Sequence, residues 1–286
     1  MTPPGAGAMA GRVLIVAGSD SGGGAGIQAD IKTVTALGGY AMTAVTALTA
    51  QNTRGVFAIH DVPADFVAEQ MRVVLSDIGA DCVKVGMLHR PDVIEAVCDV
   101  LEAEAAVVAA AGGRRVPIVV DPVMVAKGGE SLLAPEAMAS LKARMIPLAD
   151  VLMPNVAEAE ALTGLTVRGP DDAGPAARKL AVPGSGAVLL KGGHLAGETV
   201  IDILAVDGEI VEVFESPRID TPHTHGTGCT LASATTTGLA QGMAVRDAVA
   251  RARRYVHEAI LTAPGLGHGH GPLNHAHTVG PFGVDG

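Results

Sequence analysis

Aromatic residues are scarce in this chain of 286 residues, which contains no Trp, two Tyr and four Phe. The apolar fraction is nevertheless 48%, so a core built from Val, Leu, Ile, Ala and Met is expected. A chain of this length forms either one large α/β domain or two small domains. No linker or change in composition divides it, which favours one domain.

Basic residues are also few, with 20 Lys and Arg against 30 Asp and Glu, a formal net charge of −10. This balance argues against nucleic acids and anionic membranes as partners. No apolar run reaches membrane-spanning length, and the first residues, MTPPGAGAMAG, do not resemble a secretory signal. The three cysteines, Cys82, Cys98 and Cys229, show no CxxC spacing, which is typical of a reduced, cytoplasmic protein.

Apolar strands alternate with helices along most of the chain. Strands are predicted at 12–17, 43–52, 56–62, 81–86, 116–121, 151–155 and 187–191, followed by a hairpin of 200–206 and 209–214. Helices are predicted at 27–37, 63–76, 91–111, 135–148, 156–162, 171–181 and 244–261. This order predicts an α/β fold with a mostly parallel sheet and helices on both faces. We expect one domain over 11–264, a flexible tail over 1–10 and a Gly/His-rich tail over 265–286.

The stretch 221–235, TPHTHGTGCTLASAT, contains the clearest chemical motif. Gly226 and Gly228 allow the backbone to bend and to turn its N–H groups to one side, and a helix is predicted to begin at Thr227 or Gly228. A helix N-terminus with free N–H groups binds anions. Cys229 would lie in the first helical turn, where the helix dipole favours the thiolate. The alternative is an ordinary junction between a loop and a helix, with an inert buried cysteine.

Polar side chains stand where the predicted parallel strands end. They are Ser19-Asp20, Gln51-Asn52, Asp121, Asn155 and Lys191. Right-handed crossovers bring such ends to one edge of a sheet, where open α/β folds bind ligands. Gln51 is either a binder of a base-like edge or a turn residue. Asp121 and Glu158 are either Mg²⁺ ligands or solvated and capping acids, whereas a cation at Lys191 favours a phosphate partner.

Two glycine-rich stretches carry weaker signals. The loop 18–26 follows the first strand, but it has neither the GxGxxG nor the P-loop spacing, so its glycines either bind a ligand or permit close helix packing. The tail beginning at Gly265 contains His268 and His270, but no Cys or carboxylate completes a metal site. We expect this tail to fold near the active site rather than to bind metal.

Taken together, the motifs resemble a known family. AGSD…GGAGIQAD, TALTAQNT, DPVM, PN..E, KGGH and GTGC occur in this order in the ribokinase-like hydroxymethylpyrimidine/phosphomethylpyrimidine kinases, and the resemblance covers residues 12–277. It implies a three-layer α/β/α fold, ATP and Mg²⁺, and a homodimer. It also implies phosphorylation of 4-amino-5-hydroxymethyl-2-methylpyrimidine to the monophosphate and then to the diphosphate, for thiamine biosynthesis.

The resemblance also implies roles for individual residues. Cys229 resembles the catalytic base, and the anion hole is implied at Gly226, Thr227 and Gly228. The pyrimidine pocket is implied at Gly18, Asp30, Gln51 and Val123. Lys191 resembles the phosphate contact, with Asn155, Thr227 and Gly228 also toward the nucleotide, and the metal ligands are implied at Asp121 and Glu158. The loop Ser21-Gly22-Gly23-Gly24 departs from the family by an extra glycine, which implies a looser lid.

Two alternatives to this function differ in what they predict. A pyridoxal or pyridoxine kinase shares the fold and often the cysteine, but Gln51 and the DPVM loop favour the aminopyrimidine. A non-catalytic pyrimidine-binding module would be expected to have lost Cys229, Lys191 or the carboxylates, and all of them are present.

Overall fold

The computed structural model describes residues 10–126, 129, 132–182 and 186–280. Within this part of the chain, nine strands form one sheet in the order β3-β2-β1-β4-β5-β6-β7-β8-β9. The strands are β1 (Arg12–Asp20), β2 (Tyr40–Asn52), β3 (Gly55–Asp61), β4 (Cys82–Val85), β5 (Ile118–Val120), β6 (Val151–Leu152), β7 (Ala187–Leu190), β8 (Thr199–Val206) and β9 (Glu209–Pro217). The six strands from β2 to β7 in the sheet are parallel, whereas β3, β8 and β9 pair antiparallel at its edges.

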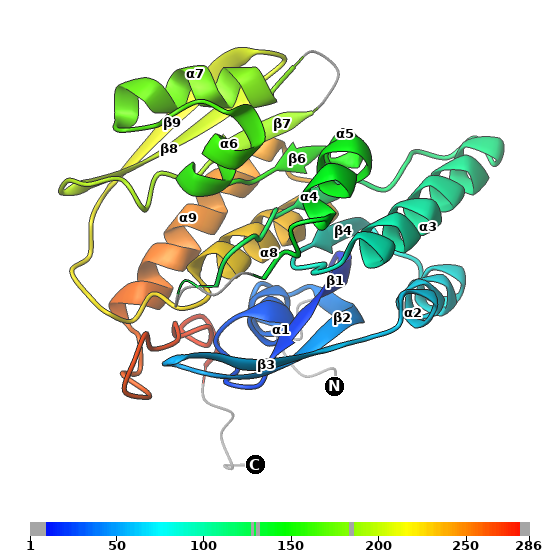
Figure 1. The fold of residues 1–286 in the computed structure, drawn as a ribbon, viewed down its shortest axis with the longest axis horizontal. Coiled ribbons are helices and arrows are strands. Elements are labelled where there is room, and N and C mark those ends of the chain that lie inside the picture. The colour runs from blue at the N-terminus through cyan, green and yellow to red at the C-terminus, as the bar shows by residue number, and fades with distance from the viewer. Residues whose placement is uncertain (1–9, 127–128, 130–131, 183–185, 281–286) are drawn as a thin grey trace, which may run out of the picture.

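Helices cover both faces of this sheet, as Figure 1 shows. The longer helices are α1 (Gly26–Ala36), α2 (Ala64–Asp77), α3 (Pro91–Ala110), α6 (Val156–Thr163), α7 (Pro170–Leu180), α8 (Thr227–Ala240) and α9 (Val245–Leu261). Helices α8 and α9 pack against each other, and α8 also packs on α1. The fold is therefore the expected three-layer α/β/α arrangement with a mostly parallel sheet.

The apolar run of β1 contributes side chains to the core on each face of the sheet. Leu14 and Val16 belong to the cluster on the side of α2, α3 and α7, whereas Val13 and Ile15 point to the side of α1. Successive strand residues point to opposite faces, so a continuous apolar run is needed where helices cover both. Figure 1 shows β1 inside the sheet, between β2 and β4.

One predicted helix is divided. The segment predicted as a single helix over 135–148 consists of α4 (Ala137–Ser140), a π-helical turn η1 (Leu141–Met145) and α5 (Ile146–Leu148). Pro147 lies in α5 and lacks the N–H group that an α-helical ladder requires, so a regular helix cannot continue through it.

Residues 1–9 and 281–286 lie outside the described part of the chain, so the two predicted tails are described only in part. The division into one domain and two tails stays a prediction. Among the described residues, no helix combines the length and the apolar character needed to cross a membrane.

Candidate active site

A cavity of about 1320 Å³ opens at the C-terminal ends of the parallel strands. Its lining includes Asp20 from the end of β1, Gln51 from β2, Asp121 after β5, Asn155 after β6 and Lys191 after β7. The structure thus brings together polar residues that the sequence predicts at one sheet edge. Lys191 and Asn155 also pair through an isolated backbone bridge, which extends the ladder to the cavity.

The glycine turn at the start of α8 forms one wall of this cavity. Helix α8 begins at Thr227, as predicted, and its N-cap Gly226 has a left-handed backbone with φ +84°. Gly226, Thr227 and Gly228 all line the cavity, and the first N–H groups of a helix lack partners within the helix. We call residues 226–228 the anion turn. Its position suits the binding of a phosphate group.

Lys191 lies beside this anion turn. A β-carbon built on Gly228 would lie 3.4 Å from Lys191 Nζ and 3.7 Å from Asp121 Oδ2. Lys191 donates a hydrogen bond of 2.6 Å to Asp121 Oδ1, and only 12% of its side chain is exposed. Burial opposes the charge, but Asp121 and Glu158 raise the pKa of Lys191 above its ordinary value, so it remains a cation facing the cavity.

Asn155 and Glu158 form a capping box at the start of α6. Asn155 Oδ1 accepts the Glu158 N–H at 2.9 Å, and Glu158 Oε2 accepts the Asn155 N–H at 2.8 Å. The interpretation of Glu158 as a capping acid is therefore confirmed, although Asn155 and Glu158 both also line the cavity. Burial raises the pKa of Glu158 to about 7, with Lys191 opposing the shift and Asp121 adding to it.

Cys229 lies in the first turn of α8 and lines the cavity, as predicted. The expected thiolate is not what this environment favours. Burial raises the pKa of Cys229 to about 11, even though the positive charge of Lys84 acts in the opposite direction. Desolvation of the charged form outweighs the helix N-terminus here.

Asp30 lies beneath the cavity and is absent from its lining. It is fully buried, accepts a hydrogen bond of 2.8 Å from Lys84 and accepts another of 2.6 Å from Ser233 in α8. Lys84 does line the cavity. The structure therefore places Asp30 below the cavity, where it pairs with Lys84, and Lys84 lines the cavity.

The other residues of the predicted pyrimidine pocket lie on the wall formed by β1, β2 and the loop after β5. Gly18 packs against Met87, since a β-carbon at Gly18 would lie 2.4 Å from Met87 Cε. Val123 packs against the small cluster that contains Met87. Gln51 lines the cavity through a side chain that accepts a hydrogen bond of 3.1 Å from Thr49. A side chain at Gly18 would therefore have to displace the end of the Met87 side chain on this wall.

Sequence reasoning missed two buried pairs that line the cavity. Arg253 of α9 donates a hydrogen bond of 2.7 Å to Asp202 of β8, and its guanidinium lies 5.3 Å from the centre of the Phe214 ring. His225 forms a 2.8 Å hydrogen bond with Asp20. The partners of each pair are far apart in the chain, so no local motif marks the pairing. For the second pair, Asp20 lies in the AGSD motif and His225 lies in TPHTHG, but the sequence does not show that they meet.

The Gly/His-rich segment follows the expectation that it would fold near the site. The backbone N–H of His270 donates to Thr53 O at 2.7 Å, and His270 lines the cavity. Among the described residues, no group of three or more His, Cys, Asp or Glu side chains is placed to hold a metal ion.

Comparisons with known proteins agree with this architecture. The family model of phosphomethylpyrimidine kinase matches residues 20–274. The thiamine biosynthesis bifunctional protein ThiED of Geobacter sulfurreducens is 54% identical over 265 residues, which cover 93% of this chain and about half (52%) of that protein. The hydroxymethylpyrimidine/phosphomethylpyrimidine kinase of Rhizobium meliloti is 47% identical over 92% of this chain and 96% of its own length.

Solved structures show the same ribokinase-like fold. The phosphomethylpyrimidine kinase of Clostridium difficile matches with a TM-score of 0.73 and 40% identity, over 87% of this chain and 99% of that one. The pyridoxal kinase of Bacillus subtilis in complex with ADP matches with a TM-score of 0.81 and 34% identity, over 93% of this chain and 98% of that one. Because the sequence identity, the length of chain matched and the fold all agree, this chain belongs to the phosphomethylpyrimidine kinase family.

Proposed function

We propose that this protein uses ATP to phosphorylate 4-amino-5-hydroxymethyl-2-methylpyrimidine and then phosphorylates the resulting monophosphate to the diphosphate, for thiamine biosynthesis. One observation carries the proposal. The ammonium of Lys191 faces the anion turn, 3.4 Å from the point where a β-carbon on Gly228 would lie. A fixed cation and the backbone N–H groups of a helix N-terminus together stabilise the charge that develops on a transferring phosphoryl group.

The other residues take roles around this centre. Cys229, next to the anion turn, accepts the proton of the pyrimidine hydroxymethyl group. Burial raises the pKa of its thiol, and the positive charge of Lys84 opposes part of that rise. Gly18, Gln51 and Val123 form the wall against which the pyrimidine ring binds. Asp30 supports this wall from below by holding Lys84 in place.

ATP and Mg²⁺ are the proposed co-substrate and metal. Two carboxylates, Asp121 and Glu158, line the cavity together, and Mg²⁺ in nucleotide sites needs only one or two carboxylates because phosphates and waters complete its shell. The donor set therefore fits this ion: Asp121 and Glu158 would hold it, and Asn155 would lie toward the phosphates. When bound, Mg²⁺ would neutralise charge on the nucleotide phosphates.

A pyridoxal kinase is the second candidate, because pyridoxal kinases of known structure share this fold at 31–34% identity. The curated pyrimidine kinases are more similar, at 43–47% identity over nearly their whole length. Gln51 also offers both a donor and an acceptor, which suits the edge of an aminopyrimidine.

Phosphorus NMR of the purified protein with Mg-ATP and the pyrimidine tests the proposal. We expect a monophosphate ester and then a diphosphate ester. Turnover of pyridoxal with none of the pyrimidine would favour the second candidate. Binding of pyrimidine without any ATP consumption would contradict both kinase functions.

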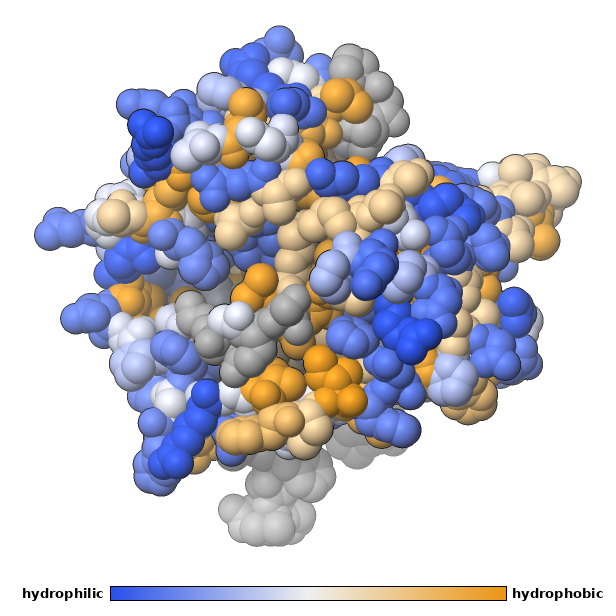
Figure 2. All heavy atoms as spheres, in the orientation of Figure 1, coloured by the Kyte–Doolittle hydropathy of each residue, from blue (hydrophilic) through white to orange (hydrophobic). Residues whose placement is uncertain are grey.

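We also propose a homodimer in the cytoplasm. Large apolar side chains stand exposed on β2, β3 and α2, namely Leu48 at 48%, Phe57 at 70% and Phe66 at 59%. Figure 2 shows hydrophobic residues gathered low on this face, where Figure 1 places β3. An exposed apolar edge of this kind is commonly covered by a partner. The cysteines are free thiols, which supports a reducing compartment.

A further inference from the structure

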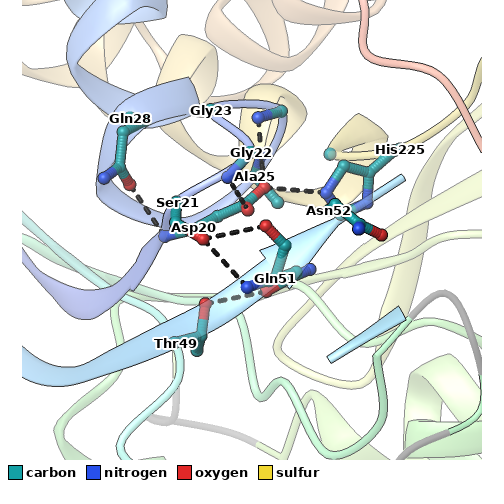
Figure 3. Close-up of polar contacts among 12 residues, drawn as sticks. Asp20, Ser21, Gly22, Gly23, Ala25, Gln28, Thr49, Gln51, Asn52 and His225 are labelled. Carbon is teal, nitrogen blue, oxygen red and sulfur yellow. Dashed lines mark hydrogen bonds and ion pairs between the residues drawn. The ribbon is translucent and has the colours of Figure 1, made fainter. Parts of the chain in front are cut away.

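A buried hydrogen bond joins two loops that are distant in sequence. Asp20 ends β1 and is 2% exposed, whereas His225 directly precedes the anion turn and is 7% exposed. The His225 Nε2 and Asp20 Oδ2 atoms are 2.8 Å apart. Figure 3 shows the imidazole of His225 reaching across to the carboxylate of Asp20, beside the strand that carries Gln51.

The Asp20 carboxylate also organises the loop that follows β1. Its Oδ1 accepts the Gly22 N–H at 2.8 Å, and its Oδ2 accepts the N–H groups of Gly24 at 3.0 Å and Ala25 at 2.8 Å. Burial opposes ionisation, but the hydrogen bonds from His225 and from the backbone hold the pKa of Asp20 below its usual value. Both oxygens therefore act as acceptors, and the imidazole nitrogen is the donor.

The two loops are in direct contact beside this bond. A β-carbon on Gly226 would lie 1.8 Å from the Gly24 carbonyl oxygen, and one on Gly24 would lie 2.5 Å from His225 Cδ2. The backbone N–H of His225 donates to Gly271 O at 3.1 Å, so the C-terminal segment meets them at the same residue. A displacement of His225 would therefore move the anion turn relative to the first loop.

We propose that Asp20 and His225 are a positioning pair that holds the anion turn in register with the loop on the pyrimidine side of the cavity. This inference rests on the proposed kinase function. The pair fixes the distance between the wall that carries the acceptor hydroxyl and the N–H groups that bind the phosphoryl group. In-line transfer depends steeply on that distance, since a misplacement of about 1 Å costs about 100-fold in rate.

A purely stabilising role would give different kinetics from a positioning role. In His225→Phe the ring remains but the donor is lost, whereas His225→Gln keeps an N–H group close to the place of Nε2. We expect His225→Phe to lower kcat about 10- to 100-fold while the KM values for pyrimidine and ATP change less than about threefold. His225→Gln should recover most of the lost kcat.

Tyr255→Phe is the matched control. Tyr255 is also buried, and its hydroxyl donates a hydrogen bond of 2.6 Å to the carbonyl of His275 in the C-terminal segment, away from the first loop. This variant should lose stability comparable to that lost by His225→Phe and keep the wild-type kcat. A kcat for His225→Phe within threefold of wild type, or an equal fall in Tyr255→Phe, would overturn the proposal.

A second measurement does not require turnover. Asp20→Ala removes both acceptor oxygens, so this variant has no hydrogen bond left to His225. We expect hydrogen exchange in the peptide 221–230 to accelerate at least about tenfold in this variant and to stay unchanged in Cys98→Ala, because Cys98 is a buried residue of α3 on the other side of the sheet. Unchanged exchange in Asp20→Ala would refute the coupling. Wild-type protein that failed to phosphorylate the pyrimidine would refute the proposed function instead, and the exchange result would still decide the coupling.

Discussion

Replacing Cys229 by Ala should separate the two phosphorylations. The first transfer has an alcohol as its acceptor and needs a base, whereas the acceptor in the second is a phosphate oxygen that is already ionised above its second pKa of about 6. A general base contributes about 10²- to 10⁴-fold. We expect the first rate to fall about 100-fold, near the lower limit, and the second rate to fall less than about threefold.

We expect a contribution near the lower limit of the range for a general base because the pKa of the Cys229 thiol is raised. With a pKa of about 11, the thiolate fraction at pH 8 is roughly one in 1,000, because each unit below the pKa reduces it tenfold. The thiolate fraction rises with pH, so the wild-type rate of the first transfer should increase about tenfold per unit between pH 7 and 9. The Cys229→Ala variant should lose this slope.

Each transfer can be followed separately by phosphorus NMR, starting once from the pyrimidine alcohol and once from its monophosphate. Cys98→Ala is the matched control, because Cys98 is a buried thiol on α3 in the opposite core. It should leave both rates unchanged. Equal losses in the two transfers for Cys229→Ala, or a flat pH profile for the wild type, would refute the base role.

Three further substitutions test the packing around the site, each by urea unfolding. Gly226 and Gly242 share φ +84°, so an alanine has the same backbone strain at both positions. A β-carbon on Gly226 would collide with the carbonyl oxygen of Gly24, whereas a β-carbon on Gly242 would have no atom within 4 Å. Gly226→Ala should therefore lower the free energy of unfolding by about 1–3 kcal/mol more than Gly242→Ala. Equal costs would contradict the contact. Burial lowers the pKa of His275 to about 4 from an ordinary 6.5, so between these values the unfolded chain binds more protons at this residue than the folded chain does. Measured relative to His275→Gln, which shares all other titrating groups, the stability of the wild type should therefore fall by about 2 kcal/mol from pH 6.5 to 5, and parallel pH profiles of the two proteins would contradict this. Lys84→Met leaves Asp30 buried without its cation and should cost about 3–5 kcal/mol, and addition of Asp30→Asn should restore part of this; no recovery would contradict the pairing.

The sequence predicts most of this fold because its signals are local. The continuous apolar run of β1 and the Asp207-Gly208 turn between β8 and β9 specify their elements within a few residues. The exception, the segment 135–148, has a helical composition, and the effect of Pro147 on its hydrogen bonding depends on the chain around it.

The sequence predicts those residues of the candidate site that lie at the ends of parallel strands. Asp121, Asn155 and Lys191 stand where parallel strands finish, and topology alone brings them to one cavity. The ionisation of Cys229 was not predictable, because it depends on the balance between the helix N-terminus and desolvation by residues from other elements.

Asp30 illustrates why sequence position does not decide which side chain lines a cavity. It lies on the inward face of α1, where Lys84 of β4 and Ser233 of α8 reach it from two other elements. A buried carboxylate needs such partners, because an unpaired charge in the interior is strongly destabilising. The partners occupy both of its oxygens, so the group that lines the cavity is the lysine.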